Sequence, residues 1–277
     1  MKISEATALE EKARDIRRLI IQTAHFSERN AHPAPALSIA DVCTALYYRF
    51  MKVDPKNPSW EERDRFILSK GHACLVSYAI LADKGYFDKK HLKTLRHPNS
   101  ILQGHPVMGK TPGVDMTSGS LGNGLGLGLG MAYYLKEMKK KSKVFVVIGD
   151  GEMNEGPIWE AMNIAPVIGA DNLIAIVDQN HFQSCGSTEE ISPMQNMRER
   201  WKSFGWKVFE INGHDMHAII STLEMAVNHQ GSPICIVANT VKGKGVSYME
   251  NNNAWHQGVV SSENYEIAMK NLTGGEV

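Results

Sequence analysis

The sequence reads VFVVIGDGEMNEG at residues 144–156 and LIAIVDQN at residues 173–180. Each segment is an apolar run of strand type that ends in small and polar residues, as buried parallel strands do where they meet a ligand. Gly149 and Gly151 flank Asp150, so the backbone can turn tightly and approach an anion. Asn180 ends the second run and offers a neutral oxygen. Since phosphate oxygens can complete the coordination of Mg²⁺ or Ca²⁺, the two runs predict a metal–diphosphate site.

The composition is that of a globular chain of 277 residues, 43% hydrophobic and 22% charged. Its 30 Lys and Arg balance 30 Asp and Glu, so charge gives no case for nucleic acid or an anionic membrane as partner. The 4 cysteines form no CxxC pair, which argues against a disulfide framework or a zinc site. We find no signal-peptide core and no apolar run of membrane-spanning length, and therefore expect a cytoplasmic protein.

Strands that alternate with helices between residues 64 and 240 predict an α/β fold with a doubly wound, mainly parallel sheet flanked by helices. The strands are expected at 64–69, 144–149, 173–179, within 204–215 and at 233–240. Helices are expected at 7–27, 38–50, 73–84, 158–168, 194–204 and in a segment that ends near 229. Ser38 is the expected N-cap of the second helix, with Asp41 in a capping-box position, and Ser192-Pro193 the capping signal of the fifth. We expect one domain over 1–277, with an N-terminal helical extension at about 1–30 and a C-terminal tail at about 246–277.

Several motifs of this sequence resemble those of one enzyme family. Gly149-Asp150-Gly151 with Asn180 at the end of the next strand is similar to the thiamine-diphosphate motif, and residues 149–156 resemble its transketolase version. Further matches are His32-Pro33, Gly71-His72, Gly104-His105-Pro106, Gly119 with Leu121-Gly122, Gly205-Trp206, Asn212-Gly-His-Asp215 and His256. The resemblance covers His32 to His256 and implies the thiamin diphosphate-binding fold.

The sequence departs from the family pattern at a few positions. Ala31 and Ala34 replace the glycines of a Gly-His-Pro-Gly segment, and Ser120 and Asn123 are substitutions in the glycine-rich loop. Asn239 stands where lysine is usual, and the loop 181–186 differs from the usual Ile-Ser-Ile-Asp-Gly.

The resemblance implies a role for each matched residue. Asp150, Asn180 and the carbonyl of Phe182 would hold Mg²⁺ (or Ca²⁺). The residues implied to bind thiamine diphosphate are His72, Gly119, Leu121, Gly149, Asp150, Gly151, Glu155, Asn180 and His256. His32 and His256 are the candidates for proton transfer, whereas His72 and His105 would hydrogen-bond the donor sugar and orient the cofactor. His214 is interpreted as a structural turn residue.

The implied activity is transfer of a two-carbon glycolaldehyde unit from a ketose phosphate to an aldose acceptor, with pentose phosphates as the default substrates. A full transketolase also has a pyrimidine-binding domain, whose glutamate activates the cofactor, and a third domain; no residue here matches that glutamate. We therefore expect a partner chain, the C-terminal transketolase subunit, in a heterotetramer of two heterodimers with Glu155 near the seam.

Three alternatives remain open. A 2-oxo-acid dehydrogenase or deoxyxylulose-phosphate synthase type of subunit would share the metal motif without this set of histidines, and a non-catalytic binding module would keep the fold alone. A dinucleotide-binding enzyme is disfavoured because no GxGxxG follows the first strand.

Overall fold

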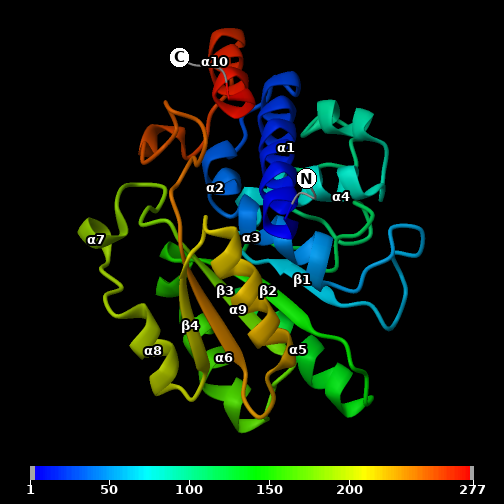
Figure 1. Ribbon diagram of the computed structural model, residues 1–277, viewed down its shortest axis with the longest axis vertical. Coiled ribbons are helices and arrows are strands. Elements are labelled where there is room, and N and C mark those ends of the chain that lie inside the picture. The colour runs from blue at the N-terminus through cyan, green and yellow to red at the C-terminus, as the bar shows by residue number, and fades with distance from the viewer. Residues whose placement is uncertain (1–3, 275–277) are drawn as a thin grey trace.

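The centre of the molecule is a parallel sheet of five strands in the order β1-β2-β3-β5-β4 (Figure 1). The computed structural model describes residues 4–274. The strands are β1 (Arg65–Leu68), β2 (Val144–Gly149), β3 (Leu173–Gln179), β4 (Lys207–Asn212) and β5 (Ile234–Asn239). All five strands, their parallel pairing and the α/β class confirm the prediction.

Helices cover both faces of this sheet. They are α1 (Glu5–Phe26), α2 (Pro33–Ser38), α3 (Ala40–Ala45), α4 (Cys74–Lys84), α5 (Asn123–Glu137), α6 (Gly156–Val167), α7 (Thr188–Ile191), α8 (Met197–Ser203), α9 (Met216–Asn228) and α10 (Ser262–Thr273). A π-helical turn, η1 (Leu46–Phe50), continues α3, and short 3₁₀ turns are η2 (Gly71–Ala73), η3 (Lys89–Thr94), η4 (Gly151–Asn154) and η5 (Asn253–Trp255). None of the helices within residues 4–274 is long and apolar enough to cross a bilayer.

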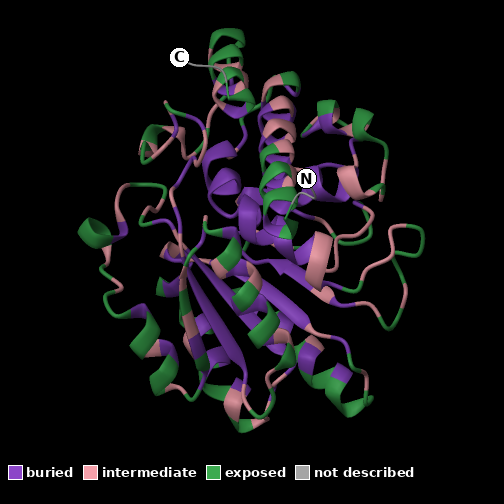
Figure 2. Cartoon of the chain, viewed as in Figure 1, coloured by how far each residue is buried: buried purple, intermediate pink, exposed green. Residues whose placement is uncertain are grey.

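Successive residues of the central strands enter two different cores. Phe145 and Val147 of β2 pack with α1, α3, α4 and α9, whereas Val146 and Ile148 pack with α5, α6 and α8. The strands are therefore apolar on both faces, and Figure 2 shows them buried between the helices. Because paired strands are in register, with Gly149 opposite Asp178 and Asp178 opposite Ala238, their carboxyl ends meet at one edge of the sheet.

The segment Pro33–Phe50 corrects one expected helix. The helix does not begin at Ser38: Ser38 is the buried last residue of α2, and its hydroxyl donates to Asp178 at 2.5 Å. Asp41 does not complete a capping box but is buried against Arg17 of α1, with nitrogen–oxygen distances of 2.5 and 2.9 Å. Both side chains instead bind residues that are distant in the sequence, and the local sequence pattern does not reveal such partners.

Two further boundaries differ from expectation. The helix expected from residue 194 starts at Met197, because Asn196 has a left-handed backbone with φ of 57°, and α7 lies in the loop before it. The predicted C-terminal tail holds the unforeseen helix α10, which lies beside α1 (Figure 1), where Arg18 donates to the carbonyl of Leu272 at 2.7 Å.

A short antiparallel bridge joins two segments far apart in the sequence. The N–H of Ala31 donates to Gly258 O at 3.0 Å, and the N–H of Gly258 returns a bond to Ala31 O at 2.9 Å. The bridge thereby fixes the chain next to His32 against the chain next to His256.

The Arg17–Asp41 pair makes a testable contribution to stability. Burial would raise the pKa of Asp41, but Arg17 and the hydrogen bond with His214 lower it to about 2, below its ordinary value of 3.8. We expect Asp41→Ala to lower the free energy of unfolding by about 3–5 kcal/mol, because it leaves a buried guanidinium unpaired. Urea titration measures this loss.

The same pair has a defined acid dependence. Because the folded pKa lies below the unfolded one, the contribution of Asp41 is complete above about pH 4 and is lost as the pH falls toward 2. Glu10→Ala, at an exposed position of α1, is the control and should change the unfolding free energy by less than about 0.5 kcal/mol. Equal stability of Asp41→Ala and this control would contradict the assignment.

Candidate functional site

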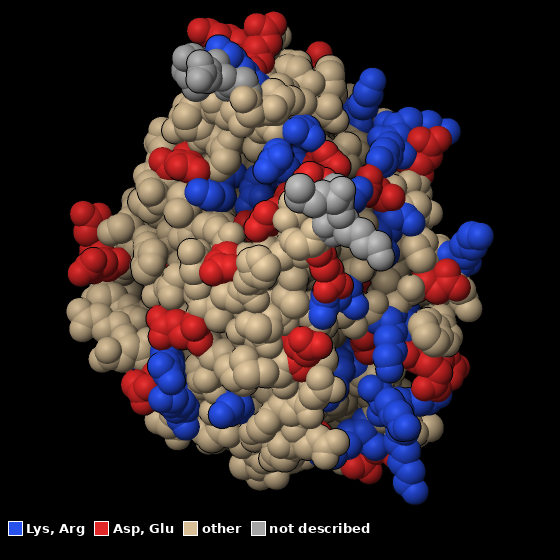
Figure 3. Space-filling model, in the orientation of Figure 1, with Lys and Arg blue, Asp and Glu red and all other residues tan. Residues whose placement is uncertain are grey.

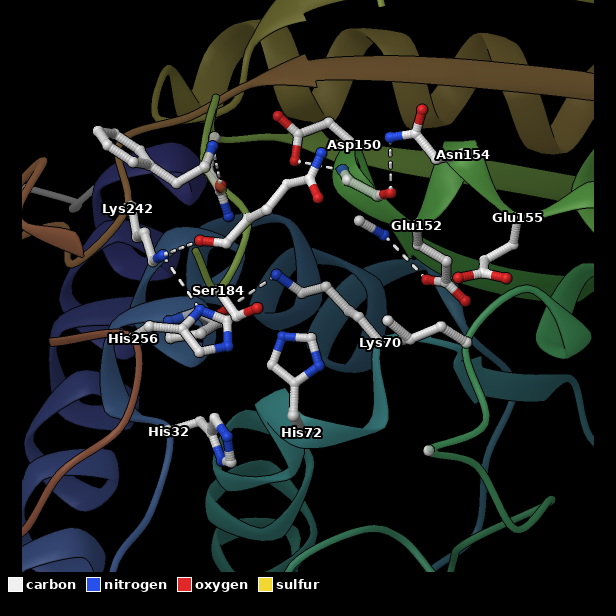
Figure 4. A pocket seen from close by; sticks show the side chains of 18 of the residues that line it. His32, Lys70, His72, Asp150, Glu152, Asn154, Glu155, Ser184, Lys242 and His256 are labelled. Carbon is white, nitrogen blue, oxygen red and sulfur yellow. Dashed lines mark hydrogen bonds between the residues drawn. The ribbon is translucent and has the colours of Figure 1, made fainter. Parts of the chain in front are cut away.

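All twelve site residues predicted from the sequence line one cavity of about 350 Å³ at the carboxyl edge of the sheet. They are His32, His72, His105, Gly119, Leu121, Gly149, Asp150, Gly151, Glu155, Asn180, Phe182 and His256. Figure 4 shows three of the histidines on one side and Asp150 on the opposite side. A pocket of this size with convergent polar groups is the expected form of a small-molecule site.

Asp150 occupies the turn directly after β2 and is almost wholly buried. Its Oδ1 accepts from the N–H of Gly151 at 2.9 Å and its Oδ2 from the N–H of His181 at 2.6 Å. Burial and the nearby charge of Asp178 raise the pKa of Asp150 to about 7. A carboxylate held in this way is stabilised by a cation, which would relieve both the desolvation and the repulsion.

Asn180 and Phe182 supply the other oxygens of the predicted metal site. Asn180 follows β3, and its Oδ1 accepts from the N–H of Phe182 at 3.1 Å. One carboxylate, one amide oxygen and one peptide carbonyl form an all-oxygen donor set that fits Mg²⁺ or Ca²⁺. Residues 4–274 contain no cluster of three or more His, Cys, Asp or Glu able to hold a metal.

Two buried lysines in the cavity wall are functional candidates that the sequence analysis did not single out. Lys242 follows β5, and its Nζ donates to Asn253 Oδ1 at 2.7 Å and to the carbonyl of Gln183 at 3.3 Å. Burial and the charge of Lys70 lower the pKa of Lys242 to about 8, so it is mainly cationic at neutral pH. Lysine is almost never buried unless it is paired. The sequence signal for a functional Lys242 was its position just beyond an apolar strand.

Glu152 is a further buried residue of the cavity that was not predicted. Its carboxylate accepts from the hydroxyl of Ser69, from the N–H of Gly122 at 2.8 Å and from the N–H of Gly149 at 3.1 Å. It thus joins the end of β1, the glycine-rich loop and the turn after β2. Its role is to hold three walls of the cavity together, and burial raises its pKa.

Glycine is required where these walls approach one another. A Cβ on Gly71 would lie 2.7 Å from the backbone nitrogen of Gly119, and one on Gly119, where φ is 132°, would lie 2.8 Å from Cδ2 of His105. No other residue type fits these contacts without displacing the wall. The glycines therefore determine how close His72 and His105 stand.

Three histidines from distant parts of the chain form a cluster in the cavity. The ring centroids of His32 and His72 are 5.4 Å apart, those of His32 and His256 5.4 Å, and those of His72 and His256 5.2 Å. His105 lies nearby on the loop that packs against Gly119. The structure thus brings all four predicted histidines together.

Burial is the main cause that keeps these imidazoles neutral. Together with neighbouring histidines and cations, it lowers the pKa of His32 to about 4, of His72 to about 2 and of His256 to about 3, and it also lowers the pKa of His105. Near pH 7 each ring therefore has one N–H donor and one acceptor nitrogen. Such groups can hydrogen-bond a hydroxyl in either direction or carry its proton.

The remaining predicted residues take less central positions. Leu121 and Glu155 are exposed at the edge of the cavity. His214 lies outside it and bridges two segments, since its Nδ1 contacts Asp41 Oδ2 at 2.8 Å while its Nε2 accepts from the N–H of Val241 at 2.8 Å. These contacts agree with a structural role for His214.

Comparison with known proteins gives a consistent set of relatives. The family model "Transketolase, thiamine diphosphate binding domain" matches residues 9–274. The 6-deoxy-6-sulfo-D-fructose transketolase subunit of Clostridium sp. (strain MSTE9) is 44% identical over 241 residues, 87% of this chain and 88% of the relative. An apulose-4-phosphate transketolase subunit of Phocaeicola vulgatus is 40% identical over 248 residues, 90% of this chain and 88% of the relative. The crystal structure of transketolase from Campylobacter jejuni superposes with a TM-score of 0.87 at 30% identity. The alignment covers 100% of this chain and 44% of the Campylobacter chain.

The cationic wall of the cavity can be tested with a simple anion. Lys242→Met should weaken the binding of inorganic pyrophosphate about 10- to 100-fold, because a hydrogen bond to a charged group contributes about 1.5–3 kcal/mol. Isothermal titration calorimetry of the full chain measures the change. Lys244→Met is the matched control: Lys244 is two residues away, is partly exposed and pairs with Glu250, so its loss should leave pyrophosphate affinity unchanged. Equal pyrophosphate affinities of the two variants would contradict the assignment of Lys242 as an anion-binding residue.

Proposed function

The chain belongs to the transketolase family, whose thiamine diphosphate-binding domain it matches over residues 9–274, and we propose that it is the diphosphate-binding subunit of a two-chain transketolase. The observation that carries the proposal is the single cavity that contains the four histidines together with Asp150 and Asn180. The match to relatives named as subunits, at 88% of their length, supports the division into two chains. In this proposal residues 1–277 form one diphosphate-binding domain.

In this proposal, oxygen donors bind the metal and a lysine attracts the diphosphate of the cofactor. Asp150, Asn180 and the carbonyl of Phe182 would hold Mg²⁺, while Lys242 would set a positive potential beside the diphosphate. His72, Gly119, Leu121, Glu155 and His256 line the rest of the cavity toward its opening. When bound, thiamine diphosphate supplies a nucleophilic carbon and takes up the negative charge that carbon–carbon cleavage leaves.

The histidines handle the substrate. His32 and His256 are neighbours in the cluster, with ring planes at 87° to each other. We assign them the removal and return of the proton on the hydroxyl next to the bond that breaks. His72 and His105 donate to the oxygens of the donor sugar. Because the pKa values of His32 and His256 are about 4 and 3, both rings are neutral near pH 7, and each has one unprotonated nitrogen and one N–H.

The carboxylates of the cavity support the need for a partner. Among the described residues, three carboxylates line the cavity: Asp150, Glu152 and Glu155. Asp150 is assigned to the metal, Glu152 already accepts from three donors, and Glu155 is exposed at the edge of the cavity. Activation of thiamine diphosphate requires a further carboxylate opposite its pyrimidine. In the proposal a second chain supplies it, two such heterodimers assemble, and Glu155 lies near their contact.

The relatives also direct the choice of substrate. Those named for 6-deoxy-6-sulfo-D-fructose and for apulose 4-phosphate are 44% and 40% identical to this chain. We therefore widen the default of pentose phosphates to any ketose that carries a terminal sulfonate or phosphate. Its first two carbons pass to an aldose phosphate acceptor.

Co-expression with the product of the neighbouring gene tests the two-chain activity. The mixture should convert at least one of 6-deoxy-6-sulfo-D-fructose, apulose 4-phosphate and xylulose 5-phosphate, with thiamine diphosphate, Mg²⁺ and an aldose phosphate present. Each chain alone should be inactive, and EDTA should abolish the reaction of the mixture. Full activity of this chain by itself would contradict the proposal.

The metal–diphosphate assignment has its own test. Asp150→Ala should weaken Mg²⁺-dependent binding of thiamine diphosphate by roughly 100-fold or more, since it removes the only charged oxygen of the proposed donor set. Calorimetric titration gives the affinity, and circular dichroism checks that the fold is retained. Asp88→Ala, at an exposed site on the loop before η3, serves as control. An Asp150→Ala variant that binds like the control would exclude the assigned site.

A further inference from the structure

Asp178 is a wholly buried carboxylate that the proposed function does not use. It is the next-to-last residue of β3, and its side chain accepts from four others. These are Lys70, Ser38, Thr240 and Asn180. They come from the chain after β1, from α2, and from the residues that follow β5 and β3, so the network spans the sheet edge that carries the cavity.

The two oxygens of Asp178 face different partners. Oδ1 accepts from the hydroxyl of Thr240. Oδ2 accepts from Lys70, from Ser38 at 2.5 Å and from Nδ2 of Asn180 at 3.3 Å. Only the Oδ2 side therefore reaches a residue of the proposed metal site.

This contact determines which way the Asn180 amide points. An amide has one donor end and one acceptor end, whereas an ionised carboxylate accepts only. Asp178 therefore holds Nδ2, and the amide oxygen lies on the other side, where it accepts from the N–H of Phe182 at 3.1 Å. Asn180 Nδ2 also lies 3.5 Å from the hydroxyl oxygen of Ser38. If Asp178 were a neutral amide, this hydroxyl could donate to a rotated Asn180, and the amide oxygen would turn away from the proposed metal site.

Asp178 also neutralises a cation next to the same site. Lys70 is 1% exposed, and its ammonium also donates to the carbonyl of Pro35 at 2.9 Å. Its stem lies against the turn that carries Asp150, since a Cβ on Gly149 would be 3.6 Å from Lys70 Cδ. Without Asp178, a buried and uncompensated positive charge would face a divalent cation.

We propose that Asp178 is a positioning residue for the metal: it fixes the Asn180 amide with its oxygen toward the cation and compensates the charge of Lys70. The inference rests on the proposed function, because the metal is the one expected with the diphosphate. Removal of a group that orients a metal ligand typically costs 10- to 100-fold in metal affinity.

The test is a Mg²⁺ titration of the full chain, co-expressed with its partner, at a fixed concentration of thiamine diphosphate. Asp178→Asn should raise the Kd for Mg²⁺ about 10- to 100-fold. Mn²⁺, followed by electron paramagnetic resonance, should report an altered ligand field in this variant. At saturating Mg²⁺ the kcat should stay within about threefold of wild type, since Asp178 does not line the cavity, so the effect should appear in the KM for metal.

Two hydroxyl deletions give a matched pair and keep the test valid if Asp178→Asn does not fold. Ser38→Ala removes a donor from Oδ2, the side that holds Asn180, whereas Thr240→Val removes the donor from Oδ1. Both should lower the free energy of unfolding in urea by a similar amount. The Kd for Mg²⁺ should rise about 3- to 10-fold for Ser38→Ala alone, as expected for one hydrogen bond of about 0.5–1.5 kcal/mol.

The outcomes separate this inference from the proposed function. If wild type binds thiamine diphosphate with Mg²⁺ but Asp178→Asn binds as tightly, the positioning role is wrong and the proposed function stands. A Thr240→Val variant that loses as much metal affinity as Ser38→Ala would also overturn it, because the effect would then be general destabilisation. If wild type shows no Mg²⁺-dependent binding, the proposed function fails and the inference fails with it.

Discussion

Parallel pairing in register is the constraint on which this site depends. The strands β1, β2, β3 and β5 end at one edge, so the residues just beyond them come together although they are far apart in the sequence. Lys70, Asp150, Asn180 and Lys242 all reach the cavity in this way. The apolar strands fix the backbone on both faces and so determine where the polar residues at their ends lie, and hydrogen bonds then orient the side chains.

The sequence was informative where a local pattern coincides with a function. The five strands and the turn around Asp150 could be predicted, because apolar runs and glycine-flanked turns have short-range signatures. The four histidines, which line one cavity, were identified by the resemblance to the transketolase family. What it could not show were roles decided by distant partners. Ser38 and Asp41 have the local pattern of a helix start, yet Asp178 and Arg17 determine their positions. Lys70, Lys242 and Glu152 are charged side chains whose burial becomes visible only when their partners are in place.

Charge in the interior is balanced locally, while the exterior is mixed. Figure 3 shows basic and acidic side chains interspersed over one face, in keeping with a net charge of 0. Inside, Asp178 compensates Lys70, and Glu152 is surrounded by donors. Lys242 and Asp150 are less completely compensated, and they are the groups that an anion and a cation would reach. The electrostatic character of the cavity thus comes from a few buried groups rather than from the surface.

The bridge between Ala31 and Gly258 has a consequence for how the protein is made. It closes a very long loop, and long-range closures of this kind raise contact order and slow folding. On the ribosome, His32 emerges long before His256, so the histidine cluster cannot assemble until His256 has been synthesised. A chain translated only as far as β5 has all five strands of the sheet in its sequence but lacks His256, and with it the complete histidine cluster.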